Sequence, residues 1–481
     1  MNARLVLATA PVSLEDRYGA FAGAANTEPS FGLACLAASA REAGAAVAIV
    51  EAAAGNLPLG ETLRRVLEFK PTVVGLTATT SGIEAAAALA TRIKEARPDV
   101  LVLIGGCHGT ALPDETLTHY AGFDLAVIGE GEITLVDILQ ASDEAGGIPQ
   151  GITGTVERRD GALHHNPPRD LVHELDSLPL PAWDLLDGFP AAFRPSPARI
   201  RRWPCASVVL TRGCPNRCTF CDRSVFGRMC RAYTPAYAVR MIKQLRDDFG
   251  VREILIEDDT FIISRKRVAE FCKLLLEQKI DITWSCLGRA DRVTPELLAL
   301  MRQAGCWHIT YGIESGDAEI LKSVNKNLDI PQIRQALEWS RAAGLQTKGF
   351  FIVGFPGETE ATLASTREVA LDLPLDDISV MLLAPFPGSE IYRTASEMGT
   401  FDCDWRKMTT IEATFIPTGF TKESLEAART QLMRDFYFRP SIMLRQALHL
   451  IGRPRAAWAT FQGFLAFLQV LREGKKSKGA L

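Results

Sequence analysis

The sequence predicts an α/β protein in which a doubly wound parallel sheet precedes a partial (β/α)6 barrel and a small, mostly helical C-terminal region. Short apolar runs alternate with helix-periodic segments twice along the chain, and glycine follows several of these runs. A proline-rich stretch separates the two alternations. The expected organisation is therefore a domain over residues 1–151, a linker over 152–204, a barrel over 205–399 and a helical region over 400–481.

The first alternation is typical of a doubly wound sheet, because each short apolar run is followed by a segment with helical spacing. The strands are expected at residues 4–8, 46–50, 72–77, 100–105 and 125–129. The helices between them are expected at residues 32–43, 60–68, 83–96 and, more weakly patterned, 113–118. A ligand of such a domain would bind at the carboxyl ends of the strands.

The second alternation predicts an incomplete barrel, preceded by an extended linker. The linker is indicated by prolines, which include Pro167, Pro168, Pro179, Pro181, Pro190 and Pro195. The barrel strands are expected at residues 207–210, 253–256, 282–285, 307–312, 348–353 and 377–382. Catalytic groups are then expected at the carboxyl ends of these strands and in the loops that follow.

Composition excludes several classes of protein. Lys and Arg number 53 against 57 Asp and Glu, so the formal net charge of −4 gives no overall electrostatic reason to bind nucleic acid. The N-terminus lacks the cationic start and long apolar core of a signal peptide, and no charge-free apolar run reaches the ~18 residues that span a bilayer. We therefore expect a cytoplasmic protein whose 11 cysteines are thiols or metal ligands rather than disulfides.

Three cysteines stand directly after the first barrel strand, with the spacing CxxxCxxC. Cys214, Cys218 and Cys221 can hold three irons of a 4Fe–4S cluster and leave the fourth iron open for a ligand that is not protein. The alternative is a zinc site, which needs a fourth ligand such as Cys205 or Cys230. The position of the loop at the top of a barrel strand favours the cluster.

The cysteine motif, with an aromatic residue before its third cysteine, resembles the signature of the radical S-adenosylmethionine (SAM) superfamily. The resemblance implies that the open iron chelates the amino and carboxylate groups of SAM, and that an electron from the cluster cleaves SAM to a 5′-deoxyadenosyl radical. Motifs at the ends of later strands resemble the family's SAM contacts. The contacts implied are Phe220, Asp258, Asp259, Arg289, Glu314 and Gly354.

Most of these residues also have a structural alternative. Asp258 or Asp259 is equally typical of a helix-capping turn, Arg289 of a surface ion pair, and Gly354 of a Gly-Pro turn. Glu314 lies in so apolar a strand that it needs a partner in either case.

The first domain resembles the Rossmann-like domain of the cobalamin-binding branch of this superfamily, which includes methyltransferases and the anaerobic magnesium-protoporphyrin ester cyclases. In such domains, glycines let the backbone approach the corrin or its nucleotide tail, and Thr hydroxyls bond to that tail. The cobalamin contacts implied are Thr77, Thr80, Gly105, Gly106, His108, Gly129, Glu130, Gly131 and Glu132. The alternative is a degenerate domain that has lost cobalamin.

One departure from the wider cobalamin pattern concerns the axial ligand. Ala53 stands where the histidine of the DxHxxG motif would be, so no lower axial histidine is expected there. His108 is expected at the corrin edge or in a structural role rather than as a cobalt ligand.

The C-terminal region ends in an apolar segment with basic flanks. Residues 456–471 are apolar nearly all round, and lysines and arginines flank them within 453–478. The segment is expected to pack against the barrel, or to lie in a membrane interface with its cations toward anionic lipid.

Taken together, the resemblance implies an enzyme with three cofactors: a 4Fe–4S cluster, SAM and cobalamin. The expected reaction is C-methylation of an unactivated carbon in a bulky, apolar, lipid- or tetrapyrrole-like small molecule, with electrons from a reductant such as flavodoxin or ferredoxin. The alternatives are an oxidative cyclase or ring-rearranging enzyme with the same cofactors, and an iron–sulfur electron-transfer or sensor protein. Cys205, Cys230 and Cys403 receive no role from the sequence.

Overall fold

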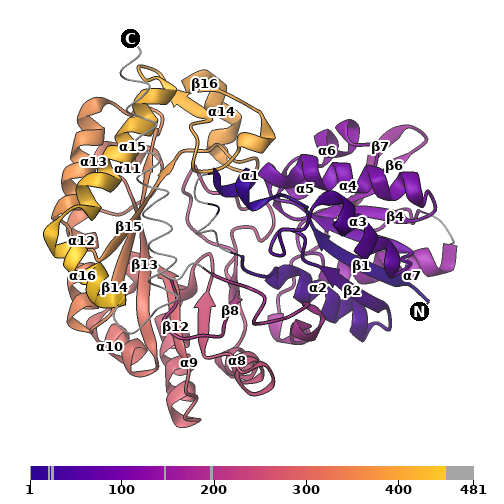
Figure 1. The fold of residues 1–481 in the computed structure, drawn as a ribbon, viewed down its shortest axis with the longest axis horizontal. Coiled ribbons are helices and arrows are strands. Elements are labelled where there is room, and N and C mark those ends of the chain that lie inside the picture. The colour runs from indigo at the N-terminus through magenta and orange to yellow at the C-terminus, as the bar shows by residue number, and fades with distance from the viewer. Residues whose placement is uncertain (1, 20–21, 23–26, 146–147, 196–198, 451–481) are drawn as a thin grey trace.

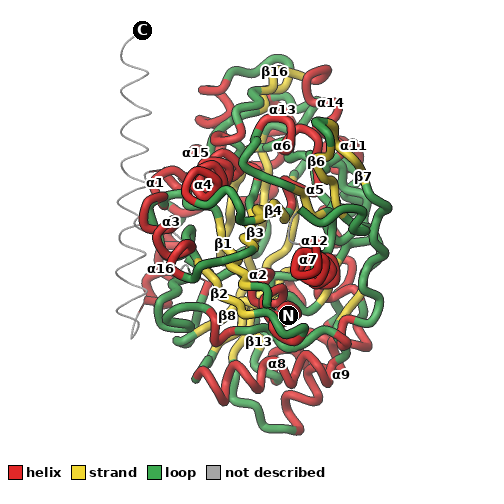
Figure 2. Tube along the Cα trace, turned by 90° about the vertical axis from the view of Figure 1, so that its right-hand side faces the viewer, coloured by secondary structure: helices red, strands yellow, loops and turns green. Residues whose placement is uncertain are grey.

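The computed structural model describes residues 2–19, 22, 27–145, 148–195 and 199–450. These residues form two α/β bodies side by side, one from the N-terminal third of the chain and one from the middle of the chain with the C-terminal helices packed on it (Figure 1). In both bodies strands lie inside and helices outside (Figure 2). The α/β class with two sheets, which the sequence predicts, is confirmed.

The first body is built on a seven-stranded sheet of order β2-β1-β3-β4-β5-β6-β7. The strands from β1 to β5 are parallel, whereas β6 and β7 are antiparallel to their neighbours. Their bounds are β1 Arg4–Thr9, β2 Ala46–Val50, β3 Val73–Thr77, β4 Leu101–Gly105, β5 Leu125–Val127, β6 Thr155–Arg159 and β7 Ala162–His165.

Helices cover both faces of this sheet, as a doubly wound fold requires. Their bounds are α1 Leu14–Tyr18, α2 Phe31–Glu42, α3 Leu59–Glu68, α4 Ile83–Ala96, α5 Cys107–Ala111, α6 Pro113–His119 and α7 Glu132–Ala145. Successive strand residues point to opposite faces, so Leu5 and Leu7 join the core under α2 and α7, while Val6 and Ala8 join the core under α3 and α4.

The segment expected as a linker differs in part from the prediction. Residues 155–165 form β6 and β7 and extend the first sheet at its β5 edge. Their sequence is short and largely polar, with β7 mostly exposed, so it lacks the apolar run of a buried strand. Farther along, the buried Trp183 packs on Phe31 of α2 and stacks on Phe189, which in turn contacts Phe249 at the end of the first barrel helix. This part of the segment therefore joins the two bodies through a shared aromatic core.

The second body is an open barrel with a six-stranded parallel sheet of order β15-β14-β13-β12-β11-β8. The strand bounds are β8 Cys205–Val208, β11 Glu253–Ile256, β12 Thr283–Gly288, β13 Cys306–Glu314, β14 Gln346–Val353 and β15 Asp377–Leu382. The helix bounds are α8 Pro235–Phe249, α9 Arg265–Glu277, α10 Pro295–Gln303, α11 Ala318–Ser323, α12 Ile330–Ala342, α13 Glu360–Asp372 and α14 Glu390–Met398.

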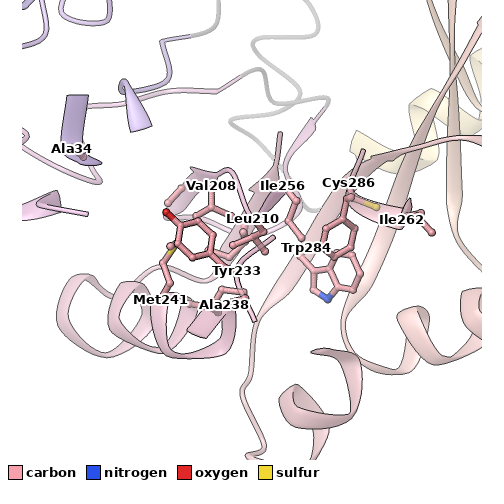
Figure 3. Packing of buried hydrophobic residues seen from close by; sticks show 14 of the residues in the cluster. Ala34, Val208, Leu210, Tyr233, Ala238, Met241, Ile256, Ile262, Trp284 and Cys286 are labelled. Atoms are coloured by element: carbon pink, nitrogen blue, oxygen red, sulfur yellow. The ribbon is translucent and has the colours of Figure 1, made fainter. Parts of the chain in front are cut away.

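Large apolar side chains fill the space between the barrel strands and the helices outside them. Figure 3 shows Val208, Ile256 and Trp284 from β8, β11 and β12 in one layer, with Tyr233 and Met241 packed beside them. Trp284 is fully buried, and its Nε1 donates to the Ala304 carbonyl at 2.8 Å. This packing fixes the strands whose carboxyl ends carry the loops described below.

A small antiparallel pair brackets the loop with the three cysteines. β9, Thr211–Arg212, pairs with β10, Arg231–Ala232, and residues 213–230 form the loop between them, called here the cysteine loop. Gly213 has φ +83°, and a Cβ there would lie 2.5 Å from the Met229 carbonyl oxygen, so the first loop residue has no room for a side chain. The pairing holds both ends of the loop at one place.

The C-terminal region is mainly helical, with one further two-stranded pair. Its elements are β16 Gly399–Phe401, β17 Phe415–Pro417, α15 Lys422–Tyr437 and α16 Pro440–Leu450. Phe436 of α15 is fully buried in the barrel core. Among the described residues, none of the helices is both long and apolar enough to cross a bilayer. The segment 453–478, expected on the barrel or at a membrane interface, lies outside the described residues.

Candidate functional site

The cysteine loop places its three motif thiols in one pocket. Cys214, Cys218 and Cys221 all line a cavity of about 230 Å³ at the carboxyl ends of β12 and β13. Asn216 donates from Nδ2 to the Cys214 Sγ at 3.1 Å. A hydrogen bond from the Cys221 thiol lowers the pKa of Cys218 to about 6, against the effect of burial and with help from the Lys326 ammonium. A low thiol pKa favours the thiolate that binds iron.

The three thiols fit a cluster better than a single ion. In the part of the chain that the structure describes, no three His, Cys, Asp or Glu side chains converge closely enough to hold one metal ion. Each cysteine of a 4Fe–4S cluster binds a different iron, so its thiolates stand farther apart than the ligands of one ion. Cys205, a suggested fourth zinc ligand, begins β8 and so lies at the opposite end of that strand from the loop. Cys230 does not line the cavity either.

Three of the residues predicted to contact SAM line the same cavity as the cysteines, namely Asp259, Arg289 and Glu314. Asp259 accepts a hydrogen bond from the Gly213 N–H at 3.1 Å, and burial raises the pKa of this carboxyl. Arg289 donates from Nη2 to the Lys326 carbonyl at 3.1 Å. The cavity therefore offers carboxylates and cations, the groups that an α-amino and an α-carboxylate group require.

Glu314 ends β13 in an unusual backbone conformation. Its φ is +71°, and the pairing of β13 with β14 is irregular between Gly312 and Glu314. Its Oε1 accepts a hydrogen bond from the Lys326 Nζ at 2.6 Å, and both side chains are 7% exposed. A Cβ at Gly312 would lie 2.4 Å from Glu314 Oε1 and 2.8 Å from Lys326 Nζ, so a side chain there would displace this ion pair. A strained, non-glycine residue held beside a cavity is typical of a functional site.

Asp258 is turned away from this cavity and supports the loop instead. Its Oδ1 accepts a hydrogen bond from the Leu210 N–H at 2.6 Å, at the point where the chain leaves β8. Burial raises the pKa of Asp258 to about 7. The carboxylate bonds a strand connection and not a helix cap, so it differs from the alternative that the sequence offers, and a SAM contact of Asp258 stays a prediction.

Phe220 and Gly354 also lie outside the cavity lining. The Phe220 ring packs 5.6 Å from the Phe355 ring, and the Gly354 N–H donates to Glu358 Oε2 at 2.7 Å. Gly354 has φ +96°, as in the turn that the sequence offers as its alternative. SAM contacts of both residues stay predictions.

Several residues that line the cavity escape the sequence analysis, among them Lys326, Asn216 and Asp222. The second and third lie between or beside the motif cysteines, so their position in the loop is a usable signal. Lys326 has no such signal in the sequence. It follows a short helix, and only the fold brings its ammonium group to the Glu314 carboxylate.

A second and larger cleft, of about 350 Å³, opens at the carboxyl ends of the first-domain strands and is also lined by residues of the second body. Gly106 begins α5 with φ +90°, and a Cβ there would lie 2.6 Å from Thr77 Oγ1. The glycines thus leave bare backbone along the cleft, which fits the close approach of a large planar ligand. The predicted cobalamin contacts that line it are Thr77, Gly105, Gly106, Gly129, Glu130, Gly131 and Glu132.

Two other predicted cobalamin contacts, Thr80 and His108, are buried outside the lining of this cleft. His108 is 1% exposed and its ring lies 5.4 Å from that of Trp405 in the C-terminal region. Burial lowers the pKa of His108 to about 4, so the ring is neutral at pH 7. A structural role, one of the two expected for this residue, agrees with this position.

The lower axial ligand expected to be missing is absent from the described cleft residues. Ala53 donates its N–H to Thr9 Oγ1 at 3.0 Å, and Glu51 accepts the Ser30 N–H at 2.6 Å. No histidine is found among the described residues that line the cleft. The end of β2 therefore gives the cofactor no imidazole.

Family comparisons agree with this division into two sites. The radical SAM superfamily model matches residues 208–370, and the B12 binding domain model matches residues 19–139. An uncharacterized methyltransferase of Pyrococcus horikoshii is 30% identical over 428 residues, which cover 87% of this chain and 90% of that protein.

Two further relatives extend the comparison. The anaerobic magnesium-protoporphyrin IX monomethyl ester cyclase of Rubrivivax gelatinosus is 29% identical, over 72% of this chain and 62% of the cyclase. The apo structure of the cobalamin-dependent S-adenosylmethionine radical enzyme OxsB superposes with a TM-score of 0.72 at 18% identity, over 97% of this chain and 72% of OxsB. The likeness to OxsB shows that this chain shares the fold of the matching part of OxsB.

The cysteine loop, the glycine-lined cleft and these matches lead to one conclusion about identity and cofactors. The chain belongs to the cobalamin-binding branch of the radical SAM superfamily and is an enzyme that uses a 4Fe–4S cluster, SAM and cobalamin.

Proposed function

We propose that this enzyme methylates an unactivated carbon of a small-molecule substrate. One observation carries the proposal: the cysteine loop lines both cavities. Its cysteines line the smaller cavity, while Val225 and Phe226, a few residues later, line the cleft of the first domain. A carbon activated beside the cluster would therefore stand close to a methyl group carried in the cleft.

Cys107 of the cleft and Asp222 of the smaller cavity interact electrostatically. Cys107 follows the cleft glycines, and its pKa is raised by burial and then by the carboxylate of Asp222, which lines the smaller cavity. When bound, the cluster and SAM supply a radical that removes a hydrogen atom, and cobalamin carries the methyl group. The chain itself orients the partners and excludes water around them.

Residues of the smaller cavity are proposed to hold SAM through its polar groups. The Asp259 and Glu314 carboxylates suit an ammonium group, and the guanidinium of Arg289 suits a carboxylate. Thr77 and the glycines at 105, 106, 129 and 131 are proposed to face the corrin and its nucleotide tail, where no side chain obstructs the backbone.

The second candidate is an oxidative cyclase, favoured by the 29% identity to the Rubrivivax enzyme. The name of that relative also supports a bulky, tetrapyrrole-like substrate. Both functions need the same two cavities. A methyltransferase and a cyclase are therefore distinguished by the products that each forms from SAM.

The test uses SAM with a trideuterated methyl group, anaerobically reconstituted protein with bound hydroxocobalamin, and a reductant such as reduced flavodoxin that supplies electrons to both the cluster and the cobalamin. A methyltransferase converts SAM to S-adenosylhomocysteine and moves the label to the extracted cobalamin, whereas a cyclase gives 5′-deoxyadenosine alone. Loss of 5′-deoxyadenosine in Cys214→Ala controls for the cluster. Retained cobalt without any label transfer would reject methylation and leave the cyclase.

A further inference from the structure

Two glutamates of the first domain are paired with two arginines of the cysteine loop hairpin. Arg212 of β9 donates to Glu130 at 2.8 Å and to Glu132 at 2.6 Å, and Arg231 of β10 donates to the other oxygen of Glu130 at 2.7 Å. All four side chains are 4–6% exposed. These four residues are called here the clasp.

The clasp also makes hydrogen bonds with the backbone of the protein. Val172 adds its N–H to Glu130 Oε2 at 2.8 Å and accepts from Arg231 at 2.8 Å through its carbonyl. Two positive and two negative charges therefore balance in a nearly buried region, where an unpaired charge is costly. The sequence predicts Glu130 and Glu132 as cobalamin contacts, whereas the structure shows their carboxylates engaged with arginines.

The glutamates nevertheless stand at the wall of the cobalamin cleft. Gly129 and Gly131 alternate with them in the connection from β5 to α7, and all of these residues line the cleft. Glu132 also begins α7, so its position is tied to a helix of the first domain. A ligand that fills the cleft against these glycines restrains the glutamates.

The arginines lie at the two ends of the cysteine loop. Arg212 is two positions before Cys214, and Arg231 follows Cys230 directly. The Arg212 guanidinium carbon also lies 5.4 Å from the Phe226 ring centroid, and Phe226 lines the cleft from the loop. Both ends of the cluster-binding loop are thus attached to the wall of the neighbouring cofactor site.

We propose that the clasp couples the two cofactor sites, so that cobalamin in the cleft slows loss of the cluster and the cluster strengthens retention of cobalamin. Coupling between the affinities of two binding sites is reciprocal by thermodynamic necessity, so each cofactor must stabilise the binding of the other. The arginines and glutamates act here as positioning residues. The inference rests on the three cofactors and on the clasp, and holds for a methyltransferase and for a cyclase alike.

The first measurement is the rate at which an iron chelator removes iron from the anaerobic holoenzyme, with and without hydroxocobalamin. We expect cobalamin to slow iron loss by about tenfold, within the usual range of coupling between sites. In Glu132→Gln the side chain keeps its shape but loses its charge, and protection should fall below about twofold at saturating cobalamin. Absence of protection in the wild-type enzyme would overturn the proposal.

The reverse measurement is the cobalamin dissociation constant with and without the cluster, using Cys214→Ala as the cluster-free protein. The cluster should tighten cobalamin binding in the wild-type background and leave it unchanged in the Glu132→Gln background. If Glu132→Gln instead weakens cobalamin equally in both forms, Glu132 is a direct cobalamin contact and the coupling is rejected.

Two further variants distinguish a loss of coupling between the two sites from a failure to fold. Glu253→Gln changes another buried carboxylate, bonded to the N–H groups of Arg201 and Arg202 at the opposite end of the barrel, and should keep full protection. Arg212→Lys keeps the charge but loses the fork that bridges the two glutamates, so it should lose protection even if Glu132→Gln fails to fold. Full protection in Arg212→Lys would reject the clasp.

Discussion

Glu314 and Lys326 form a buried ion pair in the wall of the cavity that the three cysteines line. Its Nζ to Oε1 distance is 2.6 Å, and the strained φ of Glu314 aims the carboxylate along the cavity wall. The Lys326 ammonium also lowers the pKa of Cys218, after the hydrogen bond from Cys221. One lysine thus acts on the predicted SAM contact and on a cluster ligand together.

Replacing this lysine tests the pair at the scale of single residues. Lys326→Met leaves the Glu314 carboxylate buried without its cation, which typically costs about 3–5 kcal/mol. We expect lower stability in denaturant unfolding and at least about tenfold weaker SAM binding by calorimetry.

The double variant Lys326→Met/Glu314→Gln separates stability from SAM recognition. It should recover stability, because no charge is left unpaired, but not SAM affinity. The matched control is Lys422→Met, which breaks an exposed pair with Glu412 at 3.4 Å and should cost less than about 1 kcal/mol. Wild-type SAM affinity in Lys326→Met would remove this pair from the SAM site.

At the scale of elements, the turn after β14 depends on a buried carboxyl group. Glu358 accepts the N–H groups of Gly354 and Phe355 at 2.7 and 3.1 Å, and burial raises its pKa to about 7. The folded protein therefore binds a proton at this site that the unfolded chain, with an ordinary carboxyl pKa, has released. Its contribution to stability must fall as the pH rises toward and through 7.

Glu358→Gln removes this dependence. Between pH 6 and pH 8 the wild-type free energy of unfolding should fall by about 1 kcal/mol more than that of the variant, measured by denaturant titration at each pH. Glu51 and Asp258 have pKa values raised to about 7 in the same way, so part of the slope should remain. The control Glu360→Gln changes an exposed residue at the start of α13 and should leave the slope unchanged.

The strands also show which elements can be predicted from the local sequence and which cannot. The barrel strands and most first-domain helices lie within a few residues of their predicted ranges, because buried parallel strands are continuous apolar runs. β6 and β7 were missed because their burial pattern is mixed and they pair antiparallel at an edge. The pattern of a half-exposed edge strand is weak in a single sequence.

At the scale of the whole molecule, some features of the two sites depend on contacts between segments that are distant in the sequence. These contacts could not be predicted from the sequence. The cysteine spacing predicts the cluster loop, and the glycine motifs predict the cleft. The partners of Glu130 and Glu132, by contrast, stand 82 and 80 positions away along the chain, and Lys326 meets Glu314 across a helix. An ion pair between residues far apart in the chain leaves no periodic pattern in the sequence. For this reason, some residues predicted to contact cobalamin or SAM are paired with other residues of the protein.

The distribution of charge over the molecule predicts where a reductant docks. The chain has a formal net charge of −4, yet the cysteine loop carries three arginines and one aspartate, and Arg217 and Arg228 on it are exposed. An acidic electron-transfer protein of the flavodoxin type is therefore expected to approach this loop, where the distance to the cluster is short. Electrostatic steering of this kind raises association rates and weakens with salt.

Charge reversal at these two arginines tests the docking surface. Arg217→Glu/Arg228→Glu should slow cluster reduction by reduced flavodoxin about tenfold at low salt, followed anaerobically by the bleaching of the cluster absorbance. Reduction by dithionite should stay unchanged, which shows that the cluster itself is intact. The control Arg92→Glu reverses an exposed charge on α4 of the first domain and should have no effect. Equal flavodoxin rates in the double variant and the wild type, at every salt concentration, would place the docking surface elsewhere.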